Sequence, residues 1–190
     1  MQEWKDKDLA HNITIGNFTG DKIVYSGITH LKYEDCPLED ITEIEGYKLH
    51  KKVAEAFKKM KEAAKLDGIE FFLVSAFRSI EYQKEIFPCK FINKEYPTEE
   101  EFLARLQFSA PPGFSEHHTG LAIDINSLEQ DFAETIEYKW LLKNAASFGF
   151  EMSFPEDNWQ KLGFEPWHWR YVGDDISKTI FNNARLQMSN

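Results

Sequence analysis

A chain of 190 residues, 42% of them hydrophobic and 15% aromatic, is long enough to bury a core and is an ordinary size for one domain. Its formal net charge of −10 argues against a nucleic-acid partner, because neutralising phosphates requires clustered lysine and arginine. The sequence contains no run of the roughly 18 to 20 apolar residues that an integral membrane helix needs.

The first residues and the cysteines set further limits. The start, MQEWKDKDLAHN, lacks a basic segment followed by an apolar one and so does not predict a signal peptide. We expect the protein in the cytoplasm, or in the cell envelope or periplasm if an export signal has been removed. Cys36 and Cys89 lie far apart without a CxxC spacing. This argues against a zinc–thiolate site and leaves open whether the two cysteines pair.

In chain order, the sequence predicts an N-terminal extension, residues 1–30, followed by one domain, residues 31–190. The extension contains two β-like stretches, NITIGNF and KIVYSGI. The clearest predicted helix is LHKKVAEAFKKMKEAAKLDG, in which apolar residues recur at helical spacing and a glycine provides the stop. These residues are Val53, Phe57, Met60, Ala64 and Gly68.

Shorter elements follow this helix. IEFFLVSAF is apolar and partly β-branched and predicts a buried strand, and SIEYQKEIF predicts a short helix. Thr98 and Glu101 form a capping-box pattern at the start of TEEEFLARLQF. LAIDI predicts a second strand, EYKWLLKNAASFGF a helix that ends near Gly149, and FEPWHWRYVG a third strand. Helices and strands that alternate without a regular βαβ period favour an α+β fold.

The strand LAIDI carries a carboxylate inside an apolar run. With a period of two, its three large apolar residues face the core, and Asp124 shares the other face with Ala122 and Asn126. A buried carboxylate is costly unless a cation or several donors compensate it. The pattern therefore suits the floor of a cavity. Spacing alone does not decide whether His117 or His118, both just upstream, accompanies Asp124.

The strand WHWRYV presents a second polar face. His168 and Arg170 share this face, and Glu165 precedes His168 by three residues. Two imidazoles and one carboxylate leave a zinc ion with an open position for water, and a nearby glutamate can take the proton of that water. Taken singly, each of these residues is more typical of a structural role. The prediction of a zinc site therefore rests on their convergence from separate segments of the chain. The neighbouring Trp167 and Trp169 either line a substrate groove or, as we favour, support the strand from behind.

SEHHTGLAIDI and EPWHWRYVG resemble the two signatures of the VanY-type D-alanyl-D-alanine carboxypeptidases, zinc peptidases of the group that includes lysostaphin-like enzymes and the hedgehog signalling domain. The family pattern S-x-H-x6-D followed by E-x-x-H maps onto this chain without a gap. The matching positions are Ser115, His117, Asp124, Glu165 and His168. The resemblance implies a small antiparallel sheet that carries zinc and is flanked by helices. It implies His117, Asp124 and His168 as ligands and Glu165 as the catalytic base.

The resemblance extends from about Leu31 to about Asp174. SAFRS resembles the S-G-[FY]-R-S element of the family, with Ala76 where glycine is common, and Gln83 follows Arg78 at the usual offset. The resemblance implies that Arg78, Gln83 and Ser115 bind the substrate and that Arg78 also stabilises the transition state. A guanidinium group can hold a carboxylate through two hydrogen bonds or stabilise a developing oxyanion. The family does not require a ligand at His118, which either hydrogen-bonds near the site or faces solvent.

The implied function is a zinc-dependent carboxypeptidase that removes the C-terminal D-alanine of peptidoglycan stem peptides or their precursors, as a monomer. L,D-carboxypeptidases, D,D-dipeptidases and endolysin-type endopeptidases share these ligands and remain alternatives. So do a non-catalytic cell-wall-binding module on the same scaffold and a structural domain with a salt-bridged polar cluster. The sequence does not reveal the preferred peptide, the compartment or the biological role.

Overall fold

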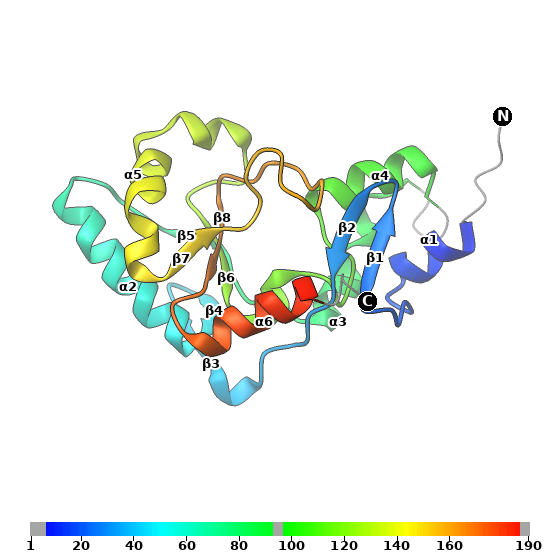
Figure 1. Ribbon diagram of the computed structural model, residues 1–190, viewed down its shortest axis with the longest axis horizontal. Helices are drawn as coiled ribbons and strands as arrows, with labels where there is room; N and C mark the ends of the chain where they lie inside the picture. Colours follow the sequence, from blue (N-terminus) through cyan, green and yellow to red (C-terminus); the bar gives the residue numbers. More distant parts are fainter. Residues whose placement is uncertain (1–6, 93–96, 187–190) are drawn as a thin grey trace.

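The computed structural model describes residues 7–92 and 97–186, and a four-stranded antiparallel sheet lies at its centre (Figure 1). Across the sheet the strands are β5 (Leu73–Ser75), β6 (Ala122–Ile125), β8 (His168–Tyr171) and β7 (Phe150–Met152). The two inner strands are therefore neighbours, and their register pairs Asp124 with His168. The α+β prediction is confirmed, and two of the predicted ligands lie side by side because of the strand order.

One face of this sheet packs into the main hydrophobic core. Ile123 and Trp169 are paired across β6 and β8, and both are buried in this core. The core also includes residues of the helices α2 (Lys51–Leu66) and α5 (Ile136–Asn144), which lie together at one end of the molecule (Figure 1). Burying each large apolar side chain contributes roughly 1.5–3 kcal/mol. Strand alternation therefore directs the apolar residues to the core and leaves Asp124 on the opposite face.

A second, smaller core forms at the other end of the molecule (Figure 1). It is formed by residues of α1 (Lys7–Thr14), β1 (Lys22–Tyr25), β2 (Ile28–Leu31) and α4 (Glu99–Phe108), together with Phe87 and Phe91, which follow α3 (Ile80–Ile86). The strands β1 and β2 form a hairpin whose turn residues Ser26 and Gly27 both have positive φ, the backbone of a type I′ turn. The capping box of Thr98 and Glu101 opens α4 as predicted.

The remaining elements complete the fold, and several of them contribute residues to the main core. They are the hairpin strands β3 (Ile41–Ile44) and β4 (Tyr47–His50), the C-terminal helix α6 (Asp175–Leu186), and the 3-10 helices η1 (Leu38–Asp40), η2 (Pro88–Lys90), η3 (Glu116–Thr119), η4 (Gln130–Glu134) and η5 (Ala145–Phe148). Gly149, at φ 83°, ends η5 near the predicted helix end. Across the described ranges, no helix combines the length and the apolar character needed to cross a membrane.

The structure corrects two local predictions. The start of NITIGNF is not strand-like, because α1 extends through Thr14. Ala10 and Ile13 are buried at helical spacing, a periodicity that outweighs the β-branched isoleucines. The strand predicted in IEFFLVSAF is limited to β5, where the register with β6 is irregular. Within this stretch Phe71 is buried, but Phe72 is 52% exposed and does not belong to the core.

The buried histidine His30 gives the fold a testable pH dependence. Its Nε2–H donates to the carbonyl of Leu106 in α4 over 2.8 Å, and burial lowers the pKa of His30 from 6.5 to about 4. The folded state therefore favours neutral His30, and its contribution to stability is lost as the pH falls from about 6.5 towards 4.

We predict that the free energy of unfolding of the wild type falls more between pH 7 and pH 5 than that of His30→Gln. The two losses should differ by about 2 kcal/mol, because at pH 5 the imidazole of His30 is protonated in the unfolded chain but stays neutral in the native protein. Urea unfolding of both proteins at the two pH values measures it. Equal losses in the two proteins would contradict this assignment.

Candidate metal centre and cleft

Three elements bring His117, Asp124 and His168 together. His117 lies in η3, Asp124 on β6 and His168 at the start of β8. The serine of the motif helps shape η3, because Ser115 Oγ accepts a hydrogen bond from the backbone N–H of His117. Gly120 ends η3 at φ 66°, and a Cβ atom there would lie 3.1 Å from the backbone nitrogen of His50. Ser115 therefore caps the start of η3 and Gly120 ends it, directly before β6.

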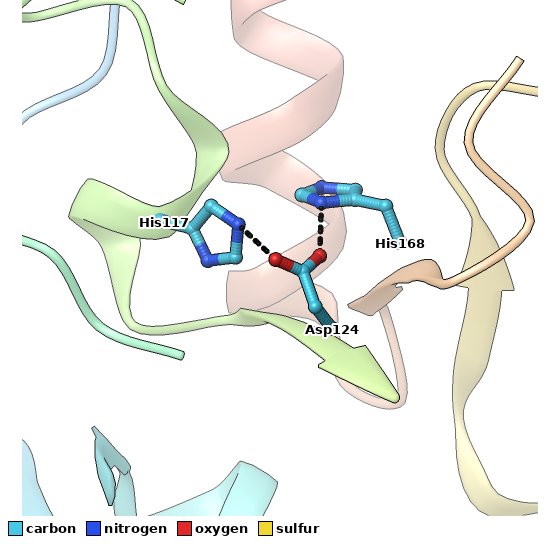
Figure 2. Close-up of side chains that lie close together, drawn as sticks. All are labelled: His117, Asp124 and His168. Atoms are coloured by element: carbon cyan, nitrogen blue, oxygen red, sulfur yellow. Dashed lines mark hydrogen bonds and ion pairs between the residues drawn. The ribbon is translucent and has the colours of Figure 1, made fainter. Parts of the chain in front are cut away.

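The three side chains point toward one another (Figure 2). His117 Nε2 lies 3.2 Å from Asp124 Oδ2, and His168 Nδ1 lies 2.9 Å from Asp124 Oδ1. The two imidazole rings meet edge to face, with centroids 4.8 Å apart. All three residues are buried. The structure therefore brings together the three residues predicted as metal ligands.

The charges in this cluster compensate one another. Burial opposes ionisation of Asp124, but its contacts with His117 and His168 outweigh burial and lower the pKa of the carboxyl. Burial likewise opposes a charge on His168, but hydrogen bonds to Asp124 and Glu116 outweigh it and raise the pKa of the imidazole to about 10. A protonated His168 therefore places a positive charge beside Asp124.

The donor set fits zinc. Each residue of the cluster offers one ligand atom, and these atoms lie within 4.8 Å of one another. Two ligands of a tetrahedral zinc ion at ordinary bond lengths lie roughly 3.3 Å apart. The two nitrogen–oxygen contacts, at 3.2 and 2.9 Å, are close to this separation, although they involve different oxygens of Asp124. His117, Asp124 and His168 therefore form a group that could hold zinc.

Glu165 lies beside the cluster, as its spacing from His168 predicts. The backbone N–H of His168 donates to the carbonyl of Glu165, so the E-x-x-H segment forms a turn. This turn places Glu165 Oε2 3.9 Å from His168 Nδ1. Burial raises the pKa of Glu165 to about 8.

Arg78 lies near the cluster, and hydrogen bonds to His117 and His118 hold its backbone in place. Its N–H donates to the carbonyl of His117, and its own carbonyl accepts from His118 Nδ1 over 2.6 Å. In the part of the chain that the structure describes, Arg78 Nε is buried without a hydrogen-bond partner. His118 also accepts from the backbone N–H of Gly113 through Nε2. Of the two expectations for His118, hydrogen bonding near the site is confirmed and exposure to solvent is wrong.

The other two predicted substrate-binding residues occupy different environments. Ser115 is buried at the start of η3 and lines the cleft. Gln83 is completely buried in α3, where its Nε2–H donates to the carbonyl of Ala110, and it does not line the cleft. Ala110 does line it. The substrate-binding roles of Ser115 and Gln83 stay predictions.

The cleft has a volume of about 750 Å³ and is lined by residues of both cores. The lining includes the cluster, Arg78 and Glu165, and also His30 of β2 and Arg105 of α4. The predicted N-terminal extension therefore contributes to the cleft through His30. A second hollow, of about 810 Å³ near α2 and β7, contains none of the predicted site residues.

Sequence reasoning missed two charged residues of the cleft. Glu116 lies between Ser115 and His117, at a position that the family pattern leaves free, so the motif gives no signal for it. Arg105 lies over the ring of Phe87, 5.5 Å from its centroid, and within the described residues its Nε has no hydrogen-bond partner. It follows the predicted capping box on a helix whose polar residues otherwise look solvated.

Comparison with known proteins gives a consistent result. The family model of VanY, D-alanyl-D-alanine carboxypeptidase, matches residues 46–174. Over 143 residues the chain is 39% identical to the putative carboxypeptidase YodJ of Bacillus subtilis (strain 168), covering 71% of this chain and 50% of YodJ. Over 174 residues it is 30% identical to a D-alanyl-D-alanine carboxypeptidase of Enterococcus faecalis (strain ATCC 700802 / V583), covering 87% and 65%. The chain thus spans about half to two thirds of the length of these relatives.

Solved structures share the fold. A point mutant of the vancomycin resistance D,D-pentapeptidase VanY, in complex with Zn(II), superposes with a TM-score of 0.61 at 29% identity, covering 78% of this chain and 88% of that one. The LD-carboxypeptidase LdcB superposes with a TM-score of 0.59 at 30% identity, covering 92% and 83%. Because the family model matches more than half of its residues, the chain belongs to the VanY D-alanyl-D-alanine carboxypeptidase family.

Proposed function

We propose that the chain is a zinc-dependent carboxypeptidase that removes the C-terminal D-alanine from peptidoglycan stem peptides or their precursors. The observation that carries this proposal is the buried convergence of His117, Asp124 and His168 at a cleft that also contains Glu165. Family membership supports the peptidase chemistry, and the zinc in the related VanY structure supports the choice of metal.

Each residue of the cleft has a role that follows from its position. His117, Asp124 and His168 would hold zinc, which supplies Lewis acidity that polarises the scissile carbonyl and makes a water acidic near neutral pH. Glu165, beside His168, accepts a proton at its carboxylate and returns it to the leaving amine. Arg78 directs its guanidinium group at the charge that develops on the carbonyl oxygen. Its lack of an ion pair within the described residues leaves it available for this role.

The main rivals use the same ligands and differ in the peptide they cut. The D,D-acting VanY and the L,D-acting LdcB are about equally similar to this chain, at 29% and 30% identity. The comparison therefore does not separate D,D- from L,D-cleavage. A non-catalytic binding module is a rival of another class. The presence of Glu165 next to a complete ligand set argues against it, because binding alone does not require a base.

The first prediction from this proposal distinguishes the two adjacent histidines. His117→Ala should bind no stoichiometric zinc, because it removes one of three ligands. His118→Gln should bind one zinc per chain even if its stability falls, because His118 contacts Arg78 and Gly113 rather than Asp124. Elemental analysis after dialysis measures both. Full zinc in His117→Ala, or none in a folded His118→Gln, would show that the ligand is misassigned.

The second prediction concerns the base. Glu165→Gln should keep zinc and lose turnover by at least about 100-fold, the range over which general acid–base groups contribute. The measurements are D-alanine release from a pentapeptide substrate and zinc content of the same preparation. Glu156→Gln, which neutralises an exposed glutamate outside the cleft lining, is the matched control and should stay active. An active Glu165→Gln variant would refute the assignment.

The third prediction concerns the substrate. Muropeptides that bear tripeptide, tetrapeptide or pentapeptide stems are digested with the zinc-loaded protein, and the products are weighed by mass spectrometry. We expect pentapeptide stems to lose one alanine. Loss of an alanine from tetrapeptide stems alone would identify an L,D-carboxypeptidase, release of D-Ala-D-Ala a dipeptidase, and internal cleavage an endopeptidase. No cleavage at any zinc concentration would favour the binding module.

A further inference from the structure

Glu116 is a buried carboxylate in contact with His168 of the cluster. Its Oε2 lies 3.2 Å from His168 Nε2 and accepts a hydrogen bond from Ser153 Oγ. Its Oε1 accepts from Arg170 Nη1 over 2.7 Å. Both oxygens are therefore fully engaged, and one of them contacts the ring edge of His168 opposite to Asp124.

This carboxylate is held in place from two elements. Glu116 belongs to η3, the same short helix that carries His117, whereas His168 and Arg170 lie two positions apart on one face of β8. Arg170 is itself fixed by Glu151 on β7, at 2.7 Å from Nε and 2.6 Å from Nη2. Hydrogen bonds to Ser153 and to the two residues of β8 thus fix the orientation of the Glu116 carboxylate.

The two nitrogens of His168 face different carboxylates. Nδ1 faces Asp124 and the predicted metal position, and Nε2 faces Glu116 (Figure 2 shows the first of these contacts). A metal-ligating imidazole almost always donates its other N–H to a carboxylate, a carbonyl or water, which fixes the tautomer and the orientation of the ring. Glu116 is the carboxylate placed to accept that bond.

We infer that Glu116 is a positioning residue of the metal centre. It accepts a hydrogen bond from Nε2–H of His168, holds the ring in its present orientation and reserves Nδ1 for the metal. The inference rests on the proposed function in requiring zinc at this cluster, but it does not depend on which peptide is cut. It also gives the buried Arg170 a role, because Arg170 balances the charge that Glu116 brings into the interior.

Spectroscopy of the wild-type protein tests the inference without a variant. The protein is labelled with ¹⁵N-histidine and loaded with ¹¹³Cd in place of zinc. We expect the cadmium to couple to Nδ1 of His168, and Nε2 to carry a proton protected from exchange. Coupling of the metal to Nε2, or an unprotonated Nε2, would overturn the inference. Failure to bind either metal would overturn both the inference and the metal centre.

A pair of variants measures the effect on affinity. Glu116→Gln keeps the shape of the side chain and should raise the zinc dissociation constant about 10- to 100-fold in competition with a chelator. Glu151→Gln neutralises the other carboxylate on Arg170 but does not contact His168. Because the Glu151 side chain is 46% exposed, its loss should change the constant by less than about fivefold.

Two outcomes with the variants would contradict the inference. One is wild-type zinc affinity in Glu116→Gln, and the other is an equal loss in Glu151→Gln, which would place the effect at Arg170 and not at His168. If Glu116→Gln does not fold, the cadmium spectrum of the wild type decides. Normal spectra and affinities without D-alanine release would instead refute the proposed substrate and leave the role of Glu116 intact.

Discussion

The site depends on the contacts that the buried carboxylate of Asp124 makes with two imidazole rings. A carboxylate on an inner strand is costly without compensation, and here both of its oxygens are engaged, one by His117 and one by His168. The pairing of β6 with β8 supplies His168, and η3, folded tightly ahead of β6, supplies His117. The same arrangement that compensates Asp124 could also hold a zinc ion.

The cleft follows from having two cores rather than one. The main core fixes the sheet that carries Asp124 and His168, whereas the smaller core brings β2 and α4 toward the same cleft. The predicted ligands and the residues that β2 and α4 contribute to the cleft therefore come from different segments of the chain. In such an arrangement the residues of β2 and α4 can vary without changing the predicted ligands.

The sequence predicted those features that depend on local patterns. The α2 helix, the capping box of Thr98 and the faces of β6 follow from periodicity and short-range hydrogen bonds. The site residues could be named because two motifs resemble a family, and spacing alone did not choose between His117 and His118. The sequence did not predict α1, the β3–β4 hairpin or Glu116. The contacts of Glu116 with Arg170 and His168 join residues more than 50 positions apart, and no local pattern encodes them.

The central claim is that one metal ion binds between His117, Asp124 and His168. Anomalous diffraction from a crystal grown with zinc, recorded on both sides of the zinc absorption edge, tests it most directly. The account predicts one strong anomalous peak within bonding distance of the two imidazoles and the carboxylate. A crystal with ample zinc but no peak there, and with Asp124 still hydrogen-bonded to both imidazoles, would contradict it.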